Sequence, residues 1–295
     1  MAMSNGVAEW LTWSFSPTIS AILVTLVVSL TLPVILHWYL YKQAVKRDVS
    51  SIILLGPSGG GKTSILTLFA NGSPSSTHTS QAPITALCQI PSTTRSREDR
   101  FRSENDTSSR SQPKFNLVDT PGHGKLRHHA LSSFTTASAV KGLIYVVDSA
   151  AVSSTAALTE TAEYLHDVLL VLQKRHTQSK TSKGPQGLPV LLAANKQDVF
   201  SSIPTNLVKT KLELEISKVR QTKSKGLLDS GIGMEDDIGG DDETNWLGEY
   251  GSETFKFAQM EEHGIDVKVV GGNVLGEDNG PGNVQDWWAW IGENL

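Results

Sequence analysis

The chain has 295 residues, and at about 150 residues per domain this length suggests roughly two domains. Hydrophobic residues make up 39% and charged residues 19%, which argues against a disordered charged chain and against a membrane protein with many spans. The formal net charge of −4 excludes a strongly basic nucleic-acid-binding protein, so no direct nucleic-acid partner is expected. The single cysteine, Cys88, cannot form an internal disulfide and favours a reducing compartment.

The first predicted element is an apolar helix over residues 18–41, a segment without Asp, Glu, Lys or Arg. At about 1.5 Å per residue it is roughly 36 Å long, enough to cross a hydrocarbon core of about 30 Å. Basic residues follow it within 42–48, whereas residues 1–17 contain no Lys or Arg. The positive-inside rule then predicts a lumenal N-terminus, one transmembrane helix, a basic juxtamembrane linker over 42–48 and a cytosolic remainder.

A cleaved signal peptide is the alternative interpretation of this apolar segment. A signal peptide combines a positively charged start, a shorter apolar stretch and a cleavage site with small residues. The sequence shows none of these features, so we expect a membrane anchor that is retained.

From Val49 onward, short apolar runs alternate with longer helical patterns. This alternation is typical of an α/β fold, with helices on both faces of a mostly parallel six-stranded sheet. The predicted strands are residues 51–55, 84–90, 114–119, 143–148, 190–194 and 265–270. The predicted helices are residues 62–70, 126–139, 153–174, 205–220 and 284–293.

Three polar stretches interrupt the pattern, at residues 91–113, 177–187 and 226–253. The first is rich in Ser, Thr and Arg, the second in Lys, Ser and Gly, and the third is acidic without Lys or Arg. Such compositions bury too little apolar surface to offset chain entropy, so disordered loops are expected. A binding tail is the alternative interpretation of the acidic stretch.

Residues 56–63, Gly-Pro-Ser-Gly-Gly-Gly-Lys-Thr, match G-x-x-x-x-G-K-[ST] between a predicted strand and a predicted helix. Glycines let backbone N–H groups converge on phosphate oxygens, and a helix N-terminus favours anions. Lys62 is expected to reach the β- and γ-phosphates, and the Thr63 hydroxyl to ligate Mg²⁺. The other candidate phosphate-binding residues of this P-loop are Gly56, Ser58, Gly59, Gly60, Gly61 and Ser64.

Two later motifs bear on which nucleotide binds. In Asp119-Thr-Pro-Gly122 (D-x-x-G), the carboxylate can hold Mg²⁺ through water and the Gly122 N–H can meet a γ-phosphate. In Asn195-Lys196-Gln197-Asp198 (N-K-Q-D), the Lys196 stem can cover the base plane. The Asp198 carboxylate can accept hydrogen bonds from guanine N1–H and the exocyclic amine, which adenine does not offer. Together these motifs predict GTP, rather than ATP, with Mg²⁺.

In this order the motifs resemble those of the small GTPases, over about residues 49–295, and N-K-Q-D is the form found in the Arf/Sar branch. The resemblance implies the P-loop NTPase small-GTPase fold. More narrowly, the chain resembles the signal recognition particle receptor β subunits, in a fungal form with long loops. That family pairs one N-terminal membrane anchor with a GTPase domain. The segments that match are the P-loop, N-K-Q-D and residues 119–127, 145–151, 255–257 and 284–287.

This resemblance implies an endoplasmic reticulum membrane protein that binds the N-terminal domain of the receptor α subunit in a GTP-dependent way. By analogy the contact involves the two switch regions, about residues 71–85 and 122–139. The signal recognition particle, the ribosome and the translocon would then be indirect partners in co-translational targeting.

Some positions depart from the small-GTPase pattern. His123 stands where many GTPases have the Gln that orients the attacking water, so it is a candidate for positioning water, and slow or partner-stimulated hydrolysis is expected. Thr79 is the candidate switch I ligand of Mg²⁺, with Thr77 and Thr85 as alternatives. Gly272 and Asn273 replace the usual fifth motif, and their backbone N–H groups are candidates for contact with guanine O6.

Two other functions stay open at this point. An Arf/Sar-like trafficking GTPase with a membrane anchor would carry the same motifs. A membrane-tethered ATPase or kinase would use the same P-loop for catalysis. Competition between ATP and GTP tests the second alternative, and co-purification with or without a receptor α subunit tests the first.

Overall fold

The computed structural model describes residues 19–44, 49–94, 112–136, 140–178, 187–229, 246–276 and 282–295. The chain divides into two units, Met1–Asp48 and Val49–Leu295, and each is described by itself. The boundary falls at the end of the predicted linker over 42–48. All strands of the described residues belong to the second unit, so one helical segment and one folded domain replace the two domains that length alone suggested.

In the first unit, helix α2 (Ile19–Ala44) corresponds to the apolar helix predicted over 18–41. Its apolar side chains are exposed, with Leu23 at 59% and Ile35 at 63%. Within α2 the side chains of residues 19 and 22–38 are described. Over the described part of the chain, no helix is long and apolar enough to cross a membrane. The predicted lumenal end (1–17) and residues 45–48 lie outside the described residues.

The second unit is built on a six-stranded sheet with the order β2-β3-β1-β4-β5-β6. Strand β2 pairs antiparallel with β3, and the other neighbouring strands are parallel. The mostly parallel six-stranded sheet predicted from the sequence is therefore confirmed. The strands are β1 (Ser51–Leu55), β2 (Ile84–Gln89), β3 (Lys114–Asp119), β4 (Val140–Asp148), β5 (Val190–Asn195) and β6 (Val267–Gly271).

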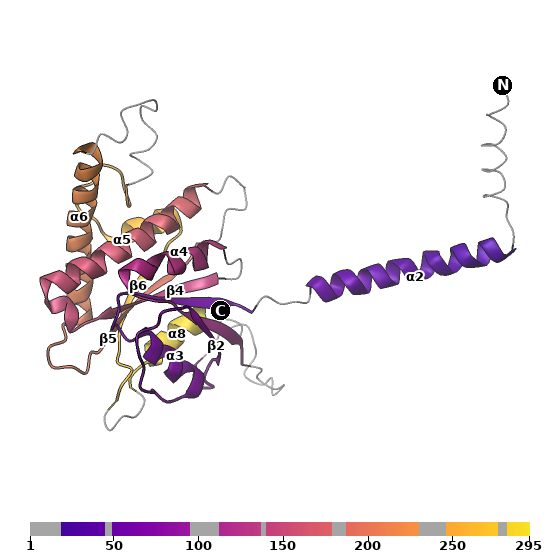
Figure 1. Cartoon of the computed structure of the whole chain (residues 1–295), viewed down its shortest axis with the longest axis horizontal. Helices are drawn as coiled ribbons and strands as arrows, with labels where there is room; N and C mark the ends of the chain where they lie inside the picture. Colours follow the sequence, from indigo (N-terminus) through magenta and orange to yellow (C-terminus); the bar gives the residue numbers. More distant parts are fainter. Residues whose placement is uncertain are drawn as a thin grey trace. The chain divides into compact units, whose positions relative to one another are not determined.

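Helices cover both faces of this sheet, as predicted. Figure 1 shows α4, α5 and α6 on one face and α3 and α8 on the other. The α-helices are α3 (Lys62–Asn71), α4 (Arg127–Thr136), α5 (Thr155–Gln178), α6 (Thr205–Asp229) and α8 (Gln285–Asn294). Short 3₁₀ turns are η2 (Gly124–Leu126), η3 (Ala151–Ser153) and η4 (Phe257–His263).

The central strand β1 shows why its sequence is continuously apolar. Side chains alternate between the two faces of a strand, and Ile53 and Leu55 join the core beneath α5 and α6. Ile52 and Leu54 join the core beneath α3 and α8. A parallel strand covered on both faces needs apolar side chains at every position, and this is the pattern that sequence reading detects.

The acidic stretch 226–253 differs from the disordered loop predicted for it. Helix α6 continues past Arg220 to Asp229, so the stretch begins inside a helix. Near its other end Leu247 is fully buried, and its carbonyl accepts a hydrogen bond of 2.9 Å from Arg220 Nη1. The acidic composition of the stretch as a whole gave no sign of the few apolar residues, such as Leu247, that pack this end onto the domain. Residues 230–245, and most of the stretches 91–113 and 177–187, lie outside the described residues.

Candidate nucleotide-binding site

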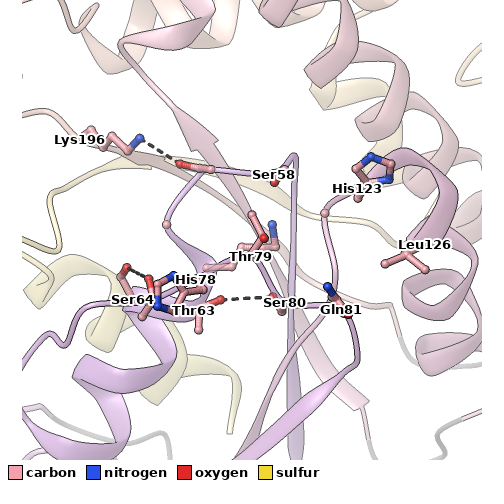
Figure 2. Close-up of a pocket in the computed structure, with 15 residues that line it drawn as sticks. Ser58, Thr63, Ser64, His78, Thr79, Ser80, Gln81, His123, Leu126 and Lys196 are labelled. Carbon is pink, nitrogen blue, oxygen red and sulfur yellow. Dashed lines mark hydrogen bonds between the residues drawn. The ribbon is translucent and has the colours of Figure 1, made fainter.

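The sequence motifs meet at one edge of the sheet. Strands β3, β1, β4 and β5 are parallel neighbours, so their carboxyl ends lie side by side, where α/β sheets bind ligands. A cavity of about 690 Å³ opens there, and Figure 2 shows its lining. The lining residues are Ser58, Gly59, Gly61, Lys62, Thr63, Ser64, Thr77, His78, Thr79, Ser80, Gln81, Gly122, His123, Leu126 and Lys196.

The P-loop has the backbone geometry that its glycines predict. Gly56 has φ 132°, and a Cβ there would lie 2.3 Å from the Val146 carbonyl oxygen of β4. Gly60 also packs against Val146. Gly61 caps helix α3 with φ 99° and no side-chain hydrogen bond. The first N–H groups of α3 therefore have no side-chain cap, which is the usual form of an anion site at a helix N-terminus.

Lys62 lies inside this loop with 5% of its surface exposed. Its Nζ donates to the carbonyl oxygens of Gly56 at 2.9 Å and Pro57 at 2.8 Å. Burial lowers the pKa of Lys62 to about 8, although the nearby Asp119 charge acts in the opposite direction. Among the described residues, the hydrogen bonds of this desolvated ammonium go to carbonyl oxygens. It is therefore a strong site for an anion, since a bound phosphate would supply negative charge.

Asp119, at the end of β3, is the centre of an oxygen cluster. Thr63 Oγ1 donates to Asp119 Oδ2 at 2.6 Å, and Ser80 Oγ donates to the same oxygen at 3.1 Å. Burial raises the pKa of Asp119, against the effects of Thr63, Lys62 and Ser80. Its Oδ1 is buried and has no hydrogen-bond partner among the described residues. Hydroxyl and carboxylate oxygens with such an unmatched acceptor fit the ligand preference of Mg²⁺.

The switch I hydroxyls separate into different roles. Thr79 lines the cavity, as does Thr77, whose Oγ1 lies 3.2 Å from Ser64 Oγ. Thr85 is an exposed residue of β2, opposite Val118. The hydroxyl that contacts Asp119 and Thr63 belongs to Ser80. Sequence reasoning missed Ser80 because nothing in the run 77–80 distinguishes one hydroxyl from the next.

The D-x-x-G motif continues along the cavity. A Cβ on Gly122 would lie 2.5 Å from Lys62 Nζ and 2.6 Å from the Gly56 carbonyl oxygen, so only glycine fits against the P-loop. His123 is exposed at the cavity wall, and its side chain accepts a long hydrogen bond of 3.4 Å from the Lys125 N–H as the cap of η2. The imidazole therefore faces the cavity region, and no buried partner among the described residues fixes it.

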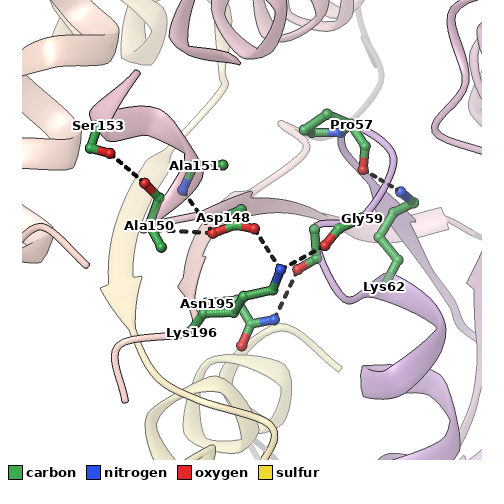
Figure 3. Close-up of polar contacts among 10 residues, drawn as sticks. Pro57, Gly59, Lys62, Asp148, Ala150, Ala151, Ser153, Asn195 and Lys196 are labelled. Carbon is green, nitrogen blue, oxygen red and sulfur yellow. Dashed lines mark hydrogen bonds and ion pairs between the residues drawn. The ribbon is translucent and has the colours of Figure 1, made fainter. Parts of the chain in front are cut away.

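The N-K-Q-D motif is joined directly to the P-loop, as Figure 3 shows. Asn195 Nδ2 donates to the Gly60 carbonyl oxygen at 2.9 Å, and Lys196 Nζ donates to that of Gly59 at 3.0 Å. Lys196 lines the cavity. Asp198 is exposed in the turn that follows β5, outside the lining of the cavity.

The fifth-motif residues contact the rest of the protein. The Gly272 N–H donates to the Ala194 carbonyl at 3.0 Å, and the Asn273 N–H donates to the Asn283 carbonyl at 3.2 Å. A Cβ on Gly272 would lie 2.7 Å from the Trp287 ring. Contact of either N–H with a guanine base would require these hydrogen bonds to be exchanged, and neither residue lines the cavity.

Asp148 and Ser149, at the end of β4, are site residues that sequence reasoning did not assign. Asp148 Oδ2 accepts a hydrogen bond of 2.5 Å from Lys196 Nζ. Ser149 Oγ accepts one of 2.7 Å from the Gln197 side chain. Their position after the apolar run of a strand, as in the P-loop and N-K-Q-D, is the signal that would have found them.

The family model described as signal recognition particle receptor beta subunit matches residues 47–264. The curated receptor subunit beta of Saccharomyces cerevisiae is 32% identical over 247 residues, which cover 83% of this chain and 84% of the yeast protein. The Homo sapiens protein of that name is 28% identical over 281 residues, covering 93% and 86%.

Solved structures agree with the sequence relatives. The structure described as the signal recognition particle receptor SRb-GTP/SRX complex from Chaetomium thermophilum is similar with a TM-score of 0.66 and 34% identity, over 83% of this chain and 100% of that one. The SRb-GDP-Mg structure from the same organism has a TM-score of 0.58 and 37% identity, over 84% and 98%. Since the family model spans most of the chain, this chain belongs to the family of signal recognition particle receptor β subunits.

Proposed function

We propose that this chain is the membrane-anchored, GTP-binding subunit of a signal recognition particle receptor, and that it recruits the receptor α subunit when GTP is bound. The observation that carries the proposal is the junction of P-loop, D-x-x-G and N-K-Q-D around one cavity in a member of this family. The GTP and GDP-Mg forms of the Chaetomium relative support the choice of ligand.

The residues present fit GTP and Mg²⁺. Lys62 and the uncapped start of α3 supply positive charge and N–H donors for the phosphates. Thr63, Ser80 and the unmatched oxygen of Asp119 would hold Mg²⁺, directly or through water. A bound Mg²⁺ would neutralise phosphate charge. Asp198 is the proposed acceptor for the guanine edge.

For recruitment to depend on the nucleotide, the residues that contact the nucleotide must also shape the surface that the partner binds. Residues 77–81 contribute to the cavity wall, as do Gly122, His123 and Leu126. Both sets belong to the two proposed switch regions. The Chaetomium relative is described in complex with SRX. We therefore propose that these two segments form the surface that contacts the receptor α subunit.

For the first unit, we propose a single membrane span over residues 18–41, with residues 1–17 in the lumen of the endoplasmic reticulum. The exposed apolar side chains of α2 support it. A glycosylation site engineered into residues 1–17 tests the orientation in microsomes. Glycosylation is expected, and an unmodified, protease-accessible N-terminus would contradict the proposed topology.

For the chemistry, we propose slow or partner-stimulated hydrolysis. His123 is the candidate residue for positioning water, and it is exposed with one long hydrogen bond. Single-turnover measurements on the chain alone test this. A rate above about 1 s⁻¹, the low end of typical enzymes, would contradict it.

The decisive experiment is purification from membranes in detergent, followed by identification of the bound nucleotide and the bound proteins. We expect GTP or GDP together with the receptor α subunit. Equal competition by ATP would contradict GTP selectivity and favour a tethered ATPase or kinase. Recovery of GTP without any α subunit would favour a trafficking GTPase.

A further inference from the structure

We propose that Asp148 is a positioning residue that holds Lys196 against the P-loop and thereby slows the release of guanine nucleotide. The proposal rests on the nucleotide binding proposed above. It concerns a residue that does not line the cavity and that acts through a residue that does.

The carboxylate of Asp148 is fixed from both sides, as Figure 3 shows. Its Oδ1 accepts hydrogen bonds of 3.0 Å from the N–H groups of Ala150 and Ala151, at the start of η3. Its Oδ2 accepts the bond from Lys196 Nζ at 2.5 Å, and only 16% of the Asp148 side chain is exposed. Two backbone donors thus aim one oxygen of a half-buried carboxylate at a single ammonium.

Lys196 needs such a partner. Its φ is 63°, and among the described residues other than glycine it is the one with positive φ. This conformation is unfavourable for a residue with a Cβ. Its Nζ bridges Asp148 Oδ2 and the Gly59 carbonyl oxygen, while the side chain lines the cavity. The ion pair therefore holds a strained lysine in the position where its stem can cover a base.

Ser149, the residue after Asp148, holds the two residues on either side of Lys196. Its N–H donates to the Asn195 carbonyl at 3.0 Å, and its Oγ accepts from Gln197. Together, Asp148 and Ser149 contact three successive residues of N-K-Q-D. All of these bonds join protein groups, so the support belongs to the fold of the domain itself.

Loss of the Asp148 support should change the rate at which nucleotide is released and leave the choice of base unchanged. Loss of the Asp148 charge frees a long, flexible side chain that also tethers Gly59 of the P-loop, so bound nucleotide should leave faster. The hydrogen-bonding edge of guanine is assigned to Asp198 instead. GTP and ITP, which differ in the exocyclic amine, should therefore be affected by the same factor.

The test measures release of fluorescent GDP, and of GTP and ITP by competition, from the full-length chain in detergent. Asp148→Asn keeps the size and one acceptor oxygen but removes the charge. We expect about tenfold faster release, the range of one charge-assisted hydrogen bond. Lys196→Met should accelerate release at least as much. The double variant should match Lys196→Met alone.

Two further variants separate positioning from general stability. Asp148→Glu keeps the charge and should return release to within about threefold of the unaltered chain. Asp167→Asn is the matched control, because it also removes a carboxylate paired with a lysine, Lys223, but lies outside the cavity lining. Release from this control should stay unchanged. If Asp148→Asn does not fold, Asp148→Glu in the Lys196→Met background replaces it and should have no effect.

Three results would overturn the proposal: unchanged release from Asp148→Asn, additive effects in the double variant, or a change in the ratio of GTP to ITP release. If the unaltered chain binds no guanine nucleotide, the proposed function fails together with this inference. If it binds GTP but Asp148→Asn behaves like Asp167→Asn, only the positioning role fails.

Discussion

The base end and the phosphate end of the candidate site are held in different ways. At the base end, Asn195, Lys196 and Gln197 each form a side-chain bond to the P-loop or to the end of β4. At the phosphate end, the described segment 77–81 has no helix or strand. It reaches the P-loop and D-x-x-G through hydroxyl contacts of Ser80 and Thr77.

This difference suggests that the two ends respond differently when a ligand binds. The base end is held by hydrogen bonds between protein groups, so we expect little side-chain ordering there on binding. At the phosphate end, two hydroxyls donate to one oxygen of Asp119, and a cation would replace those donors. Ligand binding therefore has most to change at the switch segment, as a segment that reports the nucleotide must allow.

Removal of the buried charge at the phosphate end should have the largest effect. In Lys62→Ala the cavity loses its buried ammonium, and we expect GTP affinity to fall by about 100-fold or more. Titration with fluorescent GTP measures it. Lys125→Ala, which removes an exposed lysine of η2, is the control and should bind within twofold of the unaltered chain. A loss below about tenfold in Lys62→Ala would place the phosphates elsewhere.

The junction between the two ends is tested at Gly61. In Gly61→Ala the new Cβ would lie 2.3 Å from Asn195 Nδ2, at φ 99°. We expect the free energy of unfolding in urea to fall by about 2–3 kcal/mol. Gly59→Ala is the matched control, because Gly59 also has positive φ, but beyond its chain neighbours no atom of the described residues lies within 4 Å of the added Cβ. If both variants lose the same stability, the contact with Asn195 contributes nothing.

The next prediction concerns how GTP affinity and stability vary with pH through Lys62 at the phosphate end. Because the pKa of Lys62 is about 8 instead of 10.5, GTP affinity should fall above pH 8, by up to about tenfold per pH unit. Between pH 8 and 10.5 the unfolded chain holds a proton on Lys62 that the folded chain has lost. Lys62 should therefore contribute a rise in the free energy of unfolding without nucleotide over that window. Above pH 9 the buried Cys88 thiol opposes this rise, because burial raises its pKa from 9.0 to about 11.

Lys62→Arg supplies the control for this series. An arginine stays protonated throughout the range, so both trends should flatten. A persistent fall in affinity above pH 8 in that variant would assign the titration to another group.

The smallest expected effect distinguishes two neighbouring hydroxyls. Ser80→Ala removes a donor to Asp119 Oδ2, and we expect the Mg²⁺ concentration that half-protects bound GDP from release to rise about threefold to tenfold. Thr79→Ala should shift it by less than about twofold. If Thr79→Ala has the larger effect, the Mg²⁺ ligand is Thr79, the residue that the sequence suggested.

The fold was predictable where local pattern and tertiary environment agree. Buried parallel strands leave apolar runs, and the P-loop glycines Gly56, Gly59 and Gly61 all adopt positive φ. The antiparallel direction of β2 and the docking of Leu247 depend on contacts with distant segments, which composition does not record. Composition therefore misassigned both ends of the acidic stretch.

Within the candidate site, the sequence indicated the motif residues at the phosphate end but not the residues that contact and support them. Lys62, Thr63 and Asp119 meet as their spacing predicts. Ser80 and Asp148 belong to no motif with its own chemistry, and their importance lies in which atoms they face. The hydrogen bonds that already use the Gly272 and Asn273 N–H groups could be seen only in three dimensions.

Helix α8 has a consequence for how the site opens. Trp288 stacks on Phe69 of α3 with ring centroids 4.0 Å apart, and Trp287 donates to the Val270 carbonyl of β6 at 3.3 Å. Through these two contacts α8 joins the helix that starts at the P-loop to β6, the strand that pairs with β5. Strand β5 ends in the Asn195 of N-K-Q-D, and Phe69 and Trp288 are far apart in the sequence. Such long-range closure slows folding. Local unfolding of α8 would loosen both ends of the cavity together, so amide exchange in α3 and α8 should follow a common rate.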